Sequence, residues 1–538
     1  MNKWKLFSMK RLSVVLLAAV VVIIAGCQAV SGIDLNRVLL NSLKVQKMES
    51  NSSISFQLLR NESADYAEGL SDEEEELLSL LSNITLQVDE AKQQDSKHMS
   101  MKGALKLGDL SIGYSLILDG ETALMTVEGA SRPFVLDMAG QSLLDAYNYG
   151  MEVEDLGPDT AAAAWPEETS LLDFGYKVID QAGGYFINKM PNPTSLKVDP
   201  LVTETVNGES LSLAHLNVKL DAEQAWAWVQ SYLSALTSDR EGLHSMMKGI
   251  VDLVLADPEL RETIALDEDG EVYEPTDEEI DETVDEIIYE LTQLNESMTE
   301  LAKEDEFSDI INDDSSVTAD VYVDAKLDIR KLSFEASYKP DPALMQEEEM
   351  PFEGIVLRID QERWNVNGDV VADKVTDKQK QSAISLDTLE SQQGYQTLRL
   401  FDPASDAYSL LRNKFHIGKQ TSEWFIWEEE APVIVTASGV TIVPLRDAAA
   451  QLGLNLSVQR DGIHLYDPAT STSVIVNKGS KKAIVNGKAV NWSYPVTVID
   501  GNTYVPARDF ARALEASVKW YTYGDNIKYN FTIEREVG

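Results

Sequence analysis

Cysteine is almost absent from this chain: Cys27 is the only one among 538 residues. A single cysteine excludes an intramolecular disulfide, a Cys-x-x-Cys redox pair and a zinc site built from several cysteines. Histidine is also scarce, and no two histidines stand two positions apart, which disfavours a copper site made of clustered imidazoles. The histidines lie at positions 98, 215, 244, 416 and 464. We therefore expect a fold stabilised by packing alone, with no catalytic residue, cofactor or dedicated metal site.

Basic residues are also few relative to acidic ones. The 45 Lys and Arg residues are outnumbered by 90 Asp and Glu, which gives a net charge of −45 and leaves weak Ca²⁺ binding by the acidic surface open. This balance argues against nucleic acid as a partner, because phosphate binding needs clustered cations. Residues 1–26 carry 4 basic and no acidic residues, and residues 431–538 carry 11 basic and 9 acidic ones, which leaves −51 on residues 27–430. This change in charge predicts a domain boundary near residue 430.

No apolar run is long enough for a permanent membrane span. The most apolar stretch, residues 12–24, is shorter than the ~20 residues that a helix needs to cross a bilayer. Basic residues precede it and small residues follow it, which is the three-part plan of a secretory signal. The basic residues are Lys3, Lys5, Lys10 and Arg11. Residues 1–26 are therefore predicted to be a signal peptide.

The end of this signal, IIAGC, resembles the lipobox of bacterial lipoproteins, in which two small residues precede the cysteine that becomes the new N-terminus. The resemblance implies cleavage between Gly26 and Cys27 and a diacylglycerol thioether on Cys27. Two acyl groups hold a protein stably at a membrane, whereas one is marginal. The implied location is the extracytoplasmic face of the cell membrane. A plain signal peptide with an incidental cysteine is the alternative.

The mature chain is predicted to have an α+β fold. Residues 27–50 are expected to form a tether and a first helix, and residues 51–430 an acidic extracytoplasmic domain. Alternation of polar and apolar residues predicts strands between 52 and 138, between 195 and 220, and after residue 315. The order of elements suggests a central antiparallel sheet packed with amphipathic helices.

Helical segments interrupt these strands. Clear helical periodicity covers residues 221–236, 238–255 and 276–304, and residues 141–182 are helix-like in composition. Ser238 with Glu241, and Thr276 with Glu279, have capping-box spacing. The helix at 276–304 has an almost wholly acidic face, which favours a solvated surface and leaves a basic partner or a divalent cation as alternatives. The acidic stretch 71–81 is more typical of a solvated loop or short helix than of a metal site.

The order of strands and helices is loosely similar to that of extracytoplasmic lipoproteins of the lipoprotein-carrier type. The similarity rests on the order of elements and on no motif. In that type an open sheet and its helices enclose an apolar cavity. A carrier of an apolar ligand is therefore one function that the resemblance implies.

The last hundred residues contain an internal repeat. VPLRD at 443–447 recurs 62 residues later as VPARD at 505–509, which predicts two strand-helix-strand units. The matched residues are Val443, Pro444, Arg446, Asp447, Val505, Pro506, Arg508 and Asp509. Proline is expected to open each helix and aspartate to lie in its first turn. Gly453 should end the first helix in a left-handed conformation, whereas Glu515 in the second copy predicts a different end. Hairpin turns are predicted at 486–487 and 500–501.

These repeats closely resemble the copper amine oxidase N-terminal-like, or stalk, domain found on surface proteins of Gram-positive bacteria, over residues 431–534 of a domain expected at 431–538. The resemblance implies no oxidase activity, because in the oxidases a separate domain has the quinone-forming Asn-Tyr-Asp/Glu sequence and a His-x-His copper pair. The only Asn-Tyr pair here, Asn148–Tyr149, is followed by Gly150. The segment EWFIWEEE, 423–430, is either an aromatic glycan patch or the first strand of this domain.

The sequence thus favours a non-enzymatic cell-surface lipoprotein with a binding or structural role in the envelope. An extracytoplasmic carrier or chaperone that holds an apolar ligand in the central sheet is the first alternative, and an envelope hydrolase that uses carboxylates is the second. Ser245 and Lys248 have Ser-x-x-Lys spacing without the companion motifs of penicillin-recognising enzymes, so coincidence is favoured. The expected partners are the membrane through Cys27, and a cell-wall polymer or another envelope protein.

Overall fold

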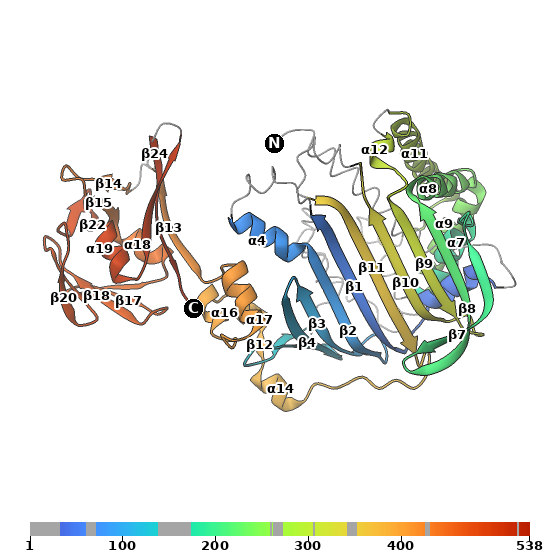
Figure 1. Cartoon of the computed structure of the whole chain (residues 1–538), viewed down its shortest axis with the longest axis horizontal. Coiled ribbons are helices and arrows are strands. Elements are labelled where there is room, and N and C mark those ends of the chain that lie inside the picture. The colour runs from blue at the N-terminus through green and yellow to red at the C-terminus, as the bar shows by residue number, and fades with distance from the viewer. Residues whose placement is uncertain are drawn as a thin grey trace. The chain divides into compact units, whose positions relative to one another are not determined.

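A computed structural model describes residues 33–60, 72–137, 174–258, 261, 273–304, 307–341, 352–425, 431–523 and 527–538. The predicted signal peptide, the Gly26–Cys27 junction and most of the helix-like stretch 141–182 lie outside these residues. The chain divides into two compact units (Figure 1). Met1–Thr126 and Val135–Gln381 make the first, called here the sheet unit. Val127–Phe134 and Ser382–Gly538 make the second, called the C-terminal unit.

The sheet unit is built on one wide sheet, with neighbours in the order β6-β5-β4-β3-β2-β1-β11-β10-β9-β8-β7. The strands are β1 (Met48–Arg60), β2 (Asn83–Gln93), β3 (His98–Leu107), β4 (Leu110–Asp119), β5 (Thr122–Val127), β6 (Phe134–Asp137), β7 (Lys197–Val206), β8 (Glu209–Asp221), β9 (Ser316–Val323), β10 (Ile329–Tyr338) and β11 (Phe352–Trp364). Every pairing from β4 to β7 is antiparallel. β1 joins the two halves of the sheet, because it pairs with β2 on one side and with β11, far away in sequence, on the other.

Except for the helix Asp72–Leu81, which contacts β2, the helices of the sheet unit gather at the β7–β10 end of this sheet (Figure 1). The helices are α2 (Leu35–Leu43), α4 (Asp72–Leu81), the π-helix η2 (Ile179–Gly183), α7 (Gly184–Lys189), α8 (Ala222–Thr237), α9 (Arg240–Ala256), α11 (Asp277–Leu301) and α12 (Phe307–Ile310). Trp228 and Tyr232 of α8 pack in one core with Leu220 of β8 and Phe334 of β10. Burying one such apolar side chain stabilises the fold by roughly 2 kcal/mol. No helix formed by the described residues is both long and apolar enough to cross a membrane.

The three predicted helices are confirmed as α8, α9 and α11, and local capping sets their starts. Thr276 and Glu279 form the predicted capping box of α11, in which the Thr276 backbone N–H donates to the Glu279 carboxylate at 2.8 Å. The predicted start of α9 is wrong by one residue. Asp239 and not Ser238 is its N-cap, because the Asp239 carboxylate accepts from the Gly242 N–H at 3.3 Å.

The C-terminal unit contains three small sheets, β13-β24-β23, β14-β15-β22-β21 and β16-β17-β18-β19-β20. Its strands are β13 (Lys419–Phe425), β14 (Ile434–Val435), β15 (Thr441–Pro444), β16 (Asn455–Gln459), β17 (Gly462–Asp467), β18 (Thr472–Val476), β19 (Lys482–Val485), β20 (Lys488–Asn491), β21 (Thr497–Ile499), β22 (Asn502–Pro506), β23 (Ser517–Tyr523) and β24 (Ile527–Glu536). Its helices are α15 (Leu386–Glu390), α16 (Gly394–Leu398), α17 (Asp406–Ser409), η3 (Leu410–Lys414), α18 (Leu445–Gln451) and α19 (Ala507–Ala513). In sequence, α14 (Asp377–Ser382) and β12 (Ile384–Ser385) stand at the change between the units.

The main segment of the C-terminal unit begins at Ser382, well before the change in charge near residue 430. Its β13 pairs with β24 at the far end of the chain, and Trp424 of β13, 2% exposed, packs in the core beside Phe531. Residues 423–425 are therefore strand, and Trp424 is a core residue instead of part of a glycan patch; the rest of the segment, 426–430, lies outside the described residues. The boundary predicted from charge and the boundary between the compact units therefore differ. They differ because the charge of surface residues does not indicate which strands share a hydrophobic core.

The predicted repeat is present as β15-α18-β16 and β22-α19-β23, and the α+β fold class is confirmed. The two copies meet where β15 pairs with β22, with Val443 opposite Val505 and both fully buried. The two predicted hairpin turns are also found, at Asn486–Gly487 between β19 and β20 and at Asp500–Gly501 between β21 and β22. All four turn residues have positive φ, as a two-residue hairpin turn of this kind requires.

The prediction that the second repeat helix ends differently is wrong. Glu515 adopts a φ of 57°, close to the 70° of Gly453. Both helix ends close with the same kind of backbone hydrogen bond, from Leu454 N–H to the Ala449 oxygen at 2.7 Å in the first copy, and between the equivalent residues 516 and 511 at 2.8 Å in the second. The second copy therefore keeps the left-handed end without glycine, and the Glu515 side chain is exposed.

Candidate functional site

Two neighbouring rows of residues show that the large sheet has one apolar and one polar face. Cross-strand register places an apolar row across eight strands, with members Ile112, Leu105, Leu86, Ile54, Ile359, Phe334, Ala319 and Val218. The row one residue away is Ser111, Lys106, Thr85, Ser55, Arg358, Glu335, Thr318 and Lys219. Successive side chains in a strand point to opposite faces, so the first row lies on one face and the second on the other.

Coverage of the apolar face changes along this row. At the helix-packed end Phe334 is 1% exposed, and it belongs to the core beneath α8. At the centre Ile54 and Leu86, which oppose one another on β1 and β2, are 39% and 37% exposed. Both strands are interior strands of the sheet. Exposed aliphatic side chains in the middle of an apolar sheet face favour a binding surface, because a packed core buries such positions.

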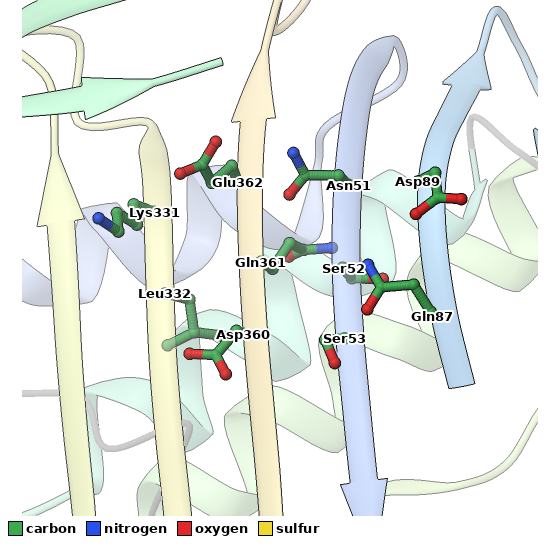
Figure 2. A pocket seen from close by; sticks show the side chains of 10 residues that line it. All are labelled: Asn51, Ser52, Ser53, Gln87, Asp89, Lys331, Leu332, Asp360, Gln361 and Glu362. Carbon is green, nitrogen blue, oxygen red and sulfur yellow. The ribbon is translucent and has the colours of Figure 1, made fainter. Parts of the chain in front are cut away.

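The polar face is hollowed where β2, β1, β11 and β10 run side by side (Figure 2). The hollow has a volume of about 330 Å³. Its lining residues are Asn51, Ser52, Ser53, Gln87, Asp89, Lys331, Leu332, Asp360, Gln361 and Glu362. Ser333 Oγ donates to Asp360 at 2.6 Å, and the Asn207 N–H donates to Glu362 at 2.9 Å. These two carboxylates therefore already have partners within the sheet.

The lysine that lines the hollow is also engaged. Lys331 donates to Glu204 at 3.0 Å, and this hydrogen bond raises the pKa of Lys331 above its ordinary value. Its ammonium group lies 5.5 Å from the centre of the Tyr322 ring. The hollow thus offers polar groups to a ligand, but its cation is held by the sheet.

The same polar face has a histidine network close by. His215 Nε2 lies 2.7 Å from Asp320, and its ring stacks on Tyr322 with centroids 4.5 Å apart. Asn217 donates to the same Asp320 oxygen at 2.9 Å. Each of the five histidines lies within 4.0 Å of a carboxylate. Among the residues that the structure describes, no group of three or more His, Cys, Asp or Glu side chains could hold a metal ion.

Basic side chains of the neighbouring helix α9 form ion pairs with the acidic helix α11. Arg240 pairs with Asp285 at 2.6 Å, and its hydrogen bond lowers the pKa of Asp285. Lys248 pairs with Asp277. Lys248 thus has a structural partner, and Ser245 Oγ donates to the backbone of its own helix at 2.8 Å. The Ser-x-x-Lys spacing therefore brings no nucleophile together with a base.

The repeat-motif residues of the C-terminal unit have structural positions. Pro444 and Pro506 are buried N-caps of α18 and α19, one residue before the expected first helical position. Asp447 and Asp509 lie in the first helical turns, as predicted. The remaining motif residues are the paired Val443 and Val505 and the exposed Arg446 and Arg508. These motif residues do not converge on a common site.

A buried ion pair that no sequence pattern indicated joins the two repeats. Arg535 of β24 and Asp467 of β17 are almost fully buried and pair through two guanidinium nitrogens. Arg535 also donates to the backbone oxygens of Leu452, at 3.1 Å, and Leu514, at 3.4 Å, which are the equivalent C-caps of α18 and α19. Burial alone would raise the pKa of Asp467, but hydrogen bonds from Arg535 and Thr470 lower it below its usual range.

Comparison with known proteins assigns part of the C-terminal unit but not the sheet unit. No curated protein and no solved structure gave a significant match. The resemblance deduced from the paired VPLRD and VPARD is confirmed for one segment: residues 426–528 match the model of a family described as the copper amine oxidase N-terminal domain, and no catalytic domain is matched.

Proposed function

We propose that this protein is a non-enzymatic lipoprotein of the extracytoplasmic membrane surface whose sheet unit binds an apolar ligand. One observation supports the proposal above others: Ile54 and Leu86, at the centre of an eight-strand apolar row, stay exposed to solvent. An acyl chain laid along this row would gain roughly 25 cal/mol for each Å² of apolar surface removed from water.

The two parts of the apolar row favour different roles. Beneath α8 the core is filled, and Leu220 and Phe334 are fully buried there, so this part of the sheet acts as a scaffold. The open centre around Ile54 supports a carrier or binding surface. A ligand that fits is elongated and apolar, because the row crosses successive strands that lie ~4.8 Å apart.

Two of the three carboxylates that line the polar hollow do not favour the hydrolase alternative. Asp360 and Glu362 each accept a hydrogen bond from the sheet unit itself, from Ser333 Oγ and from the Asn207 N–H. A catalytic acid or base must instead reach the proton that it transfers in the substrate. We therefore propose no reaction for the hollow, and we propose a structural role for the C-terminal unit, in keeping with the non-catalytic domain that it matches.

Ligand binding is tested with the full chain purified in a mild detergent. Native mass spectrometry should detect a co-purified lipid, and a fluorescent palmitate analogue should bind and be displaced by unlabelled palmitate. The variant I54Q/L86Q should weaken this binding roughly tenfold, because it places amides in the apolar row. Its matched control is S55Q/T85Q, which changes adjacent residues on the opposite face of the same two strands. Equal affinities of the two variants would contradict the proposed surface.

The proposed anchor is tested separately. Cys27→Ala removes the only cysteine sulfur in the chain, and with it the site of a diacylglycerol thioether. The variant should be released into the medium, while a Ser31→Ala control should stay with the membrane. Membrane retention of the Cys27→Ala protein would contradict lipid anchoring and leave the apolar-ligand proposal untouched.

A further inference from the structure

The C-terminal unit contains a cationic segment within an acidic chain. Residues 468–499 contain four lysines and no Asp or Glu, in a protein whose net charge is −45. The lysines are Lys478, Lys481, Lys482 and Lys488, called here the hairpin lysines, and all four are exposed. They lie on or beside the β19–β20 hairpin, and β20 is the edge strand of the five-stranded sheet.

The hairpin lysines differ in their partners from several lysines of the sheet unit. Lys92, Lys102 and Lys331 each pair with a carboxylate of the sheet unit. Within the described part of the chain, none of the hairpin lysines has a carboxylate within 4.0 Å, and Lys481 donates to the Ser493 backbone oxygen at 3.0 Å. The hairpin therefore presents uncompensated positive charge, which attracts an external anion.

The placement of these charges fits a linear polyanion better than a flat surface. Lys482 lies on the same face of the hairpin as Ile484, whereas Lys488 lies opposite Val485 and therefore on the other face. Residues 482 and 485 are three positions apart on β19, so the two charged positions are separated by about 10 Å along the sheet edge. A planar membrane contacts one face of the hairpin, but a flexible chain can follow the edge and meet both.

We propose that the edge formed by the β19–β20 hairpin binds a phosphodiester-linked polymer. Lysines supply point charges to phosphate groups without demanding fixed geometry, which suits a flexible repeating anion. The exposed Ile484 and Ala489, which pair across the hairpin, can contact the uncharged carbon chain between phosphates. The acidic sheet unit repels the same polymer, so binding is directed to this edge. The inference does not depend on the apolar-ligand proposal.

The test measures binding of the full chain, in detergent, to immobilised polyglycerol phosphate at low and moderate salt. Affinity should fall with rising salt, with a slope of about 0.7 for each phosphate contact on a logarithmic plot. The variant K478Q/K481Q/K482Q/K488Q should bind roughly 100-fold more weakly at low salt and show a shallower slope, because each lysine adds its own attraction to an anionic partner.

The matched control removes the same charge from exposed lysines of the sheet unit, as K106Q/K197Q/K326Q/K374Q. This control should change the affinity by less than about twofold, because the proposed edge keeps its charge. Equal losses in the two variants would mean that total charge and not the hairpin decides binding, and would overturn the proposal. Unchanged binding by the hairpin variant would overturn it as well. Tighter, hairpin-dependent binding to phosphatidylglycerol vesicles or to duplex DNA than to the polymer would identify a different partner and also overturn it.

Discussion

The two compact units bury apolar surface in different ways. The C-terminal unit gathers most of its buried apolar residues in one large core, where residues such as Val443, Ala448 and Phe510 are 0% exposed, and has only a small further cluster around Tyr395. The sheet unit divides its buried residues among several smaller clusters, while Ile54 and Leu86 stay exposed in the middle of its apolar face. A closed core is typical of a scaffold, whereas an open apolar face is typical of a ligand site. The difference favours the sheet unit as the part that binds an apolar ligand.

The units also differ in how they compensate charge. In the C-terminal unit one buried arginine, Arg535, satisfies a carboxylate and two helix ends at once. In the sheet unit the ion pairs are mostly half-exposed, as for Arg240 with Asp285 or Lys331 with Glu204. Exposed pairs contribute about 0–1 kcal/mol each, and breaking a buried pair costs several times more. The following substitutions test this contrast.

The largest effect is expected for Arg535→Ala. It removes the guanidinium from the buried Asp467 carboxylate, which keeps its Thr470 and Ala469 donors, and from the oxygens of Leu452 and Leu514. The loss should destabilise the C-terminal unit by about 3–5 kcal/mol. Urea unfolding followed by tryptophan fluorescence, with limited proteolysis to assign the transition, measures the change. The exposed Arg508→Ala serves as control and should cost less than about 0.5 kcal/mol. Equal costs would show that the buried pair has no special role.

The next largest change in stability is expected at a covered position of the large sheet, and it is compared with the change at an open position of the same sheet. Leu220→Ala should destabilise the sheet unit by about 3 kcal/mol, because Leu220 is 0% exposed beneath α8 and its loss leaves a cavity. Ile54→Ala should cost less than about 1 kcal/mol in the ligand-free protein, because that side chain is exposed. Urea unfolding of both variants gives the two free energies. A loss at Ile54 as large as that at Leu220 would mean that the face is closed in solution.

A smaller change in stability is expected at the helix ends of the two repeat copies, with opposite signs in the two copies. Glu515→Gly should stabilise the C-terminal unit by about 1 kcal/mol, because a residue with a Cβ is disfavoured at a φ of 57°. Gly453→Ala should destabilise it by a similar amount or more, since its φ is 70° and an added Cβ would lie 2.6 Å from the Gln393 side chain. Thermal unfolding measures both. Glu515→Ala is the control, because it removes the carboxylate and keeps the strain; if it stabilised as much as glycine, charge would be the cause.

Local sequence patterns predicted much of the fold because they act through neighbouring residues. The alternation around Ile54 and Phe334 predicted strands, and the spacing of Thr276 and Glu279 predicted the start of α11. The paired VPLRD and VPARD predicted both repeats. The end of the second repeat helix was missed, because glutamate is a poor signal for the left-handed conformation that backbone closure imposes on Glu515.

Long-range pairing could not be predicted from the sequence. Nothing local indicates that β1 pairs with β11, that Arg535 meets Asp467, or that Trp424 shares a core with Phe531. The exposure of Ile54 also depends on which elements cover the face, and the same alternation would result from a fully packed sheet. The candidate site therefore depends on which elements cover the apolar face, and the sequence does not show this. The sequence does show the lysines of the β19–β20 hairpin, but it does not show that they lack carboxylate partners.

The smallest effect concerns one half-exposed ion pair of the sheet unit. Hydrogen bonds from Lys102 and Lys92 lower the pKa of Glu90 from 4.5 to about 2. A carboxylate whose pKa is lowered in the folded state contributes stability above its unfolded pKa, and this stability is lost as the pH falls from about 4.5 towards 2. Lys102→Gln should therefore reduce the acid sensitivity of unfolding in that window, measured by urea unfolding at several pH values. Lys106→Gln, a neighbouring substitution on the same strand, should leave the pH profile unchanged; if it altered the profile equally, the lost charge and not the pairing with Glu90 would be responsible.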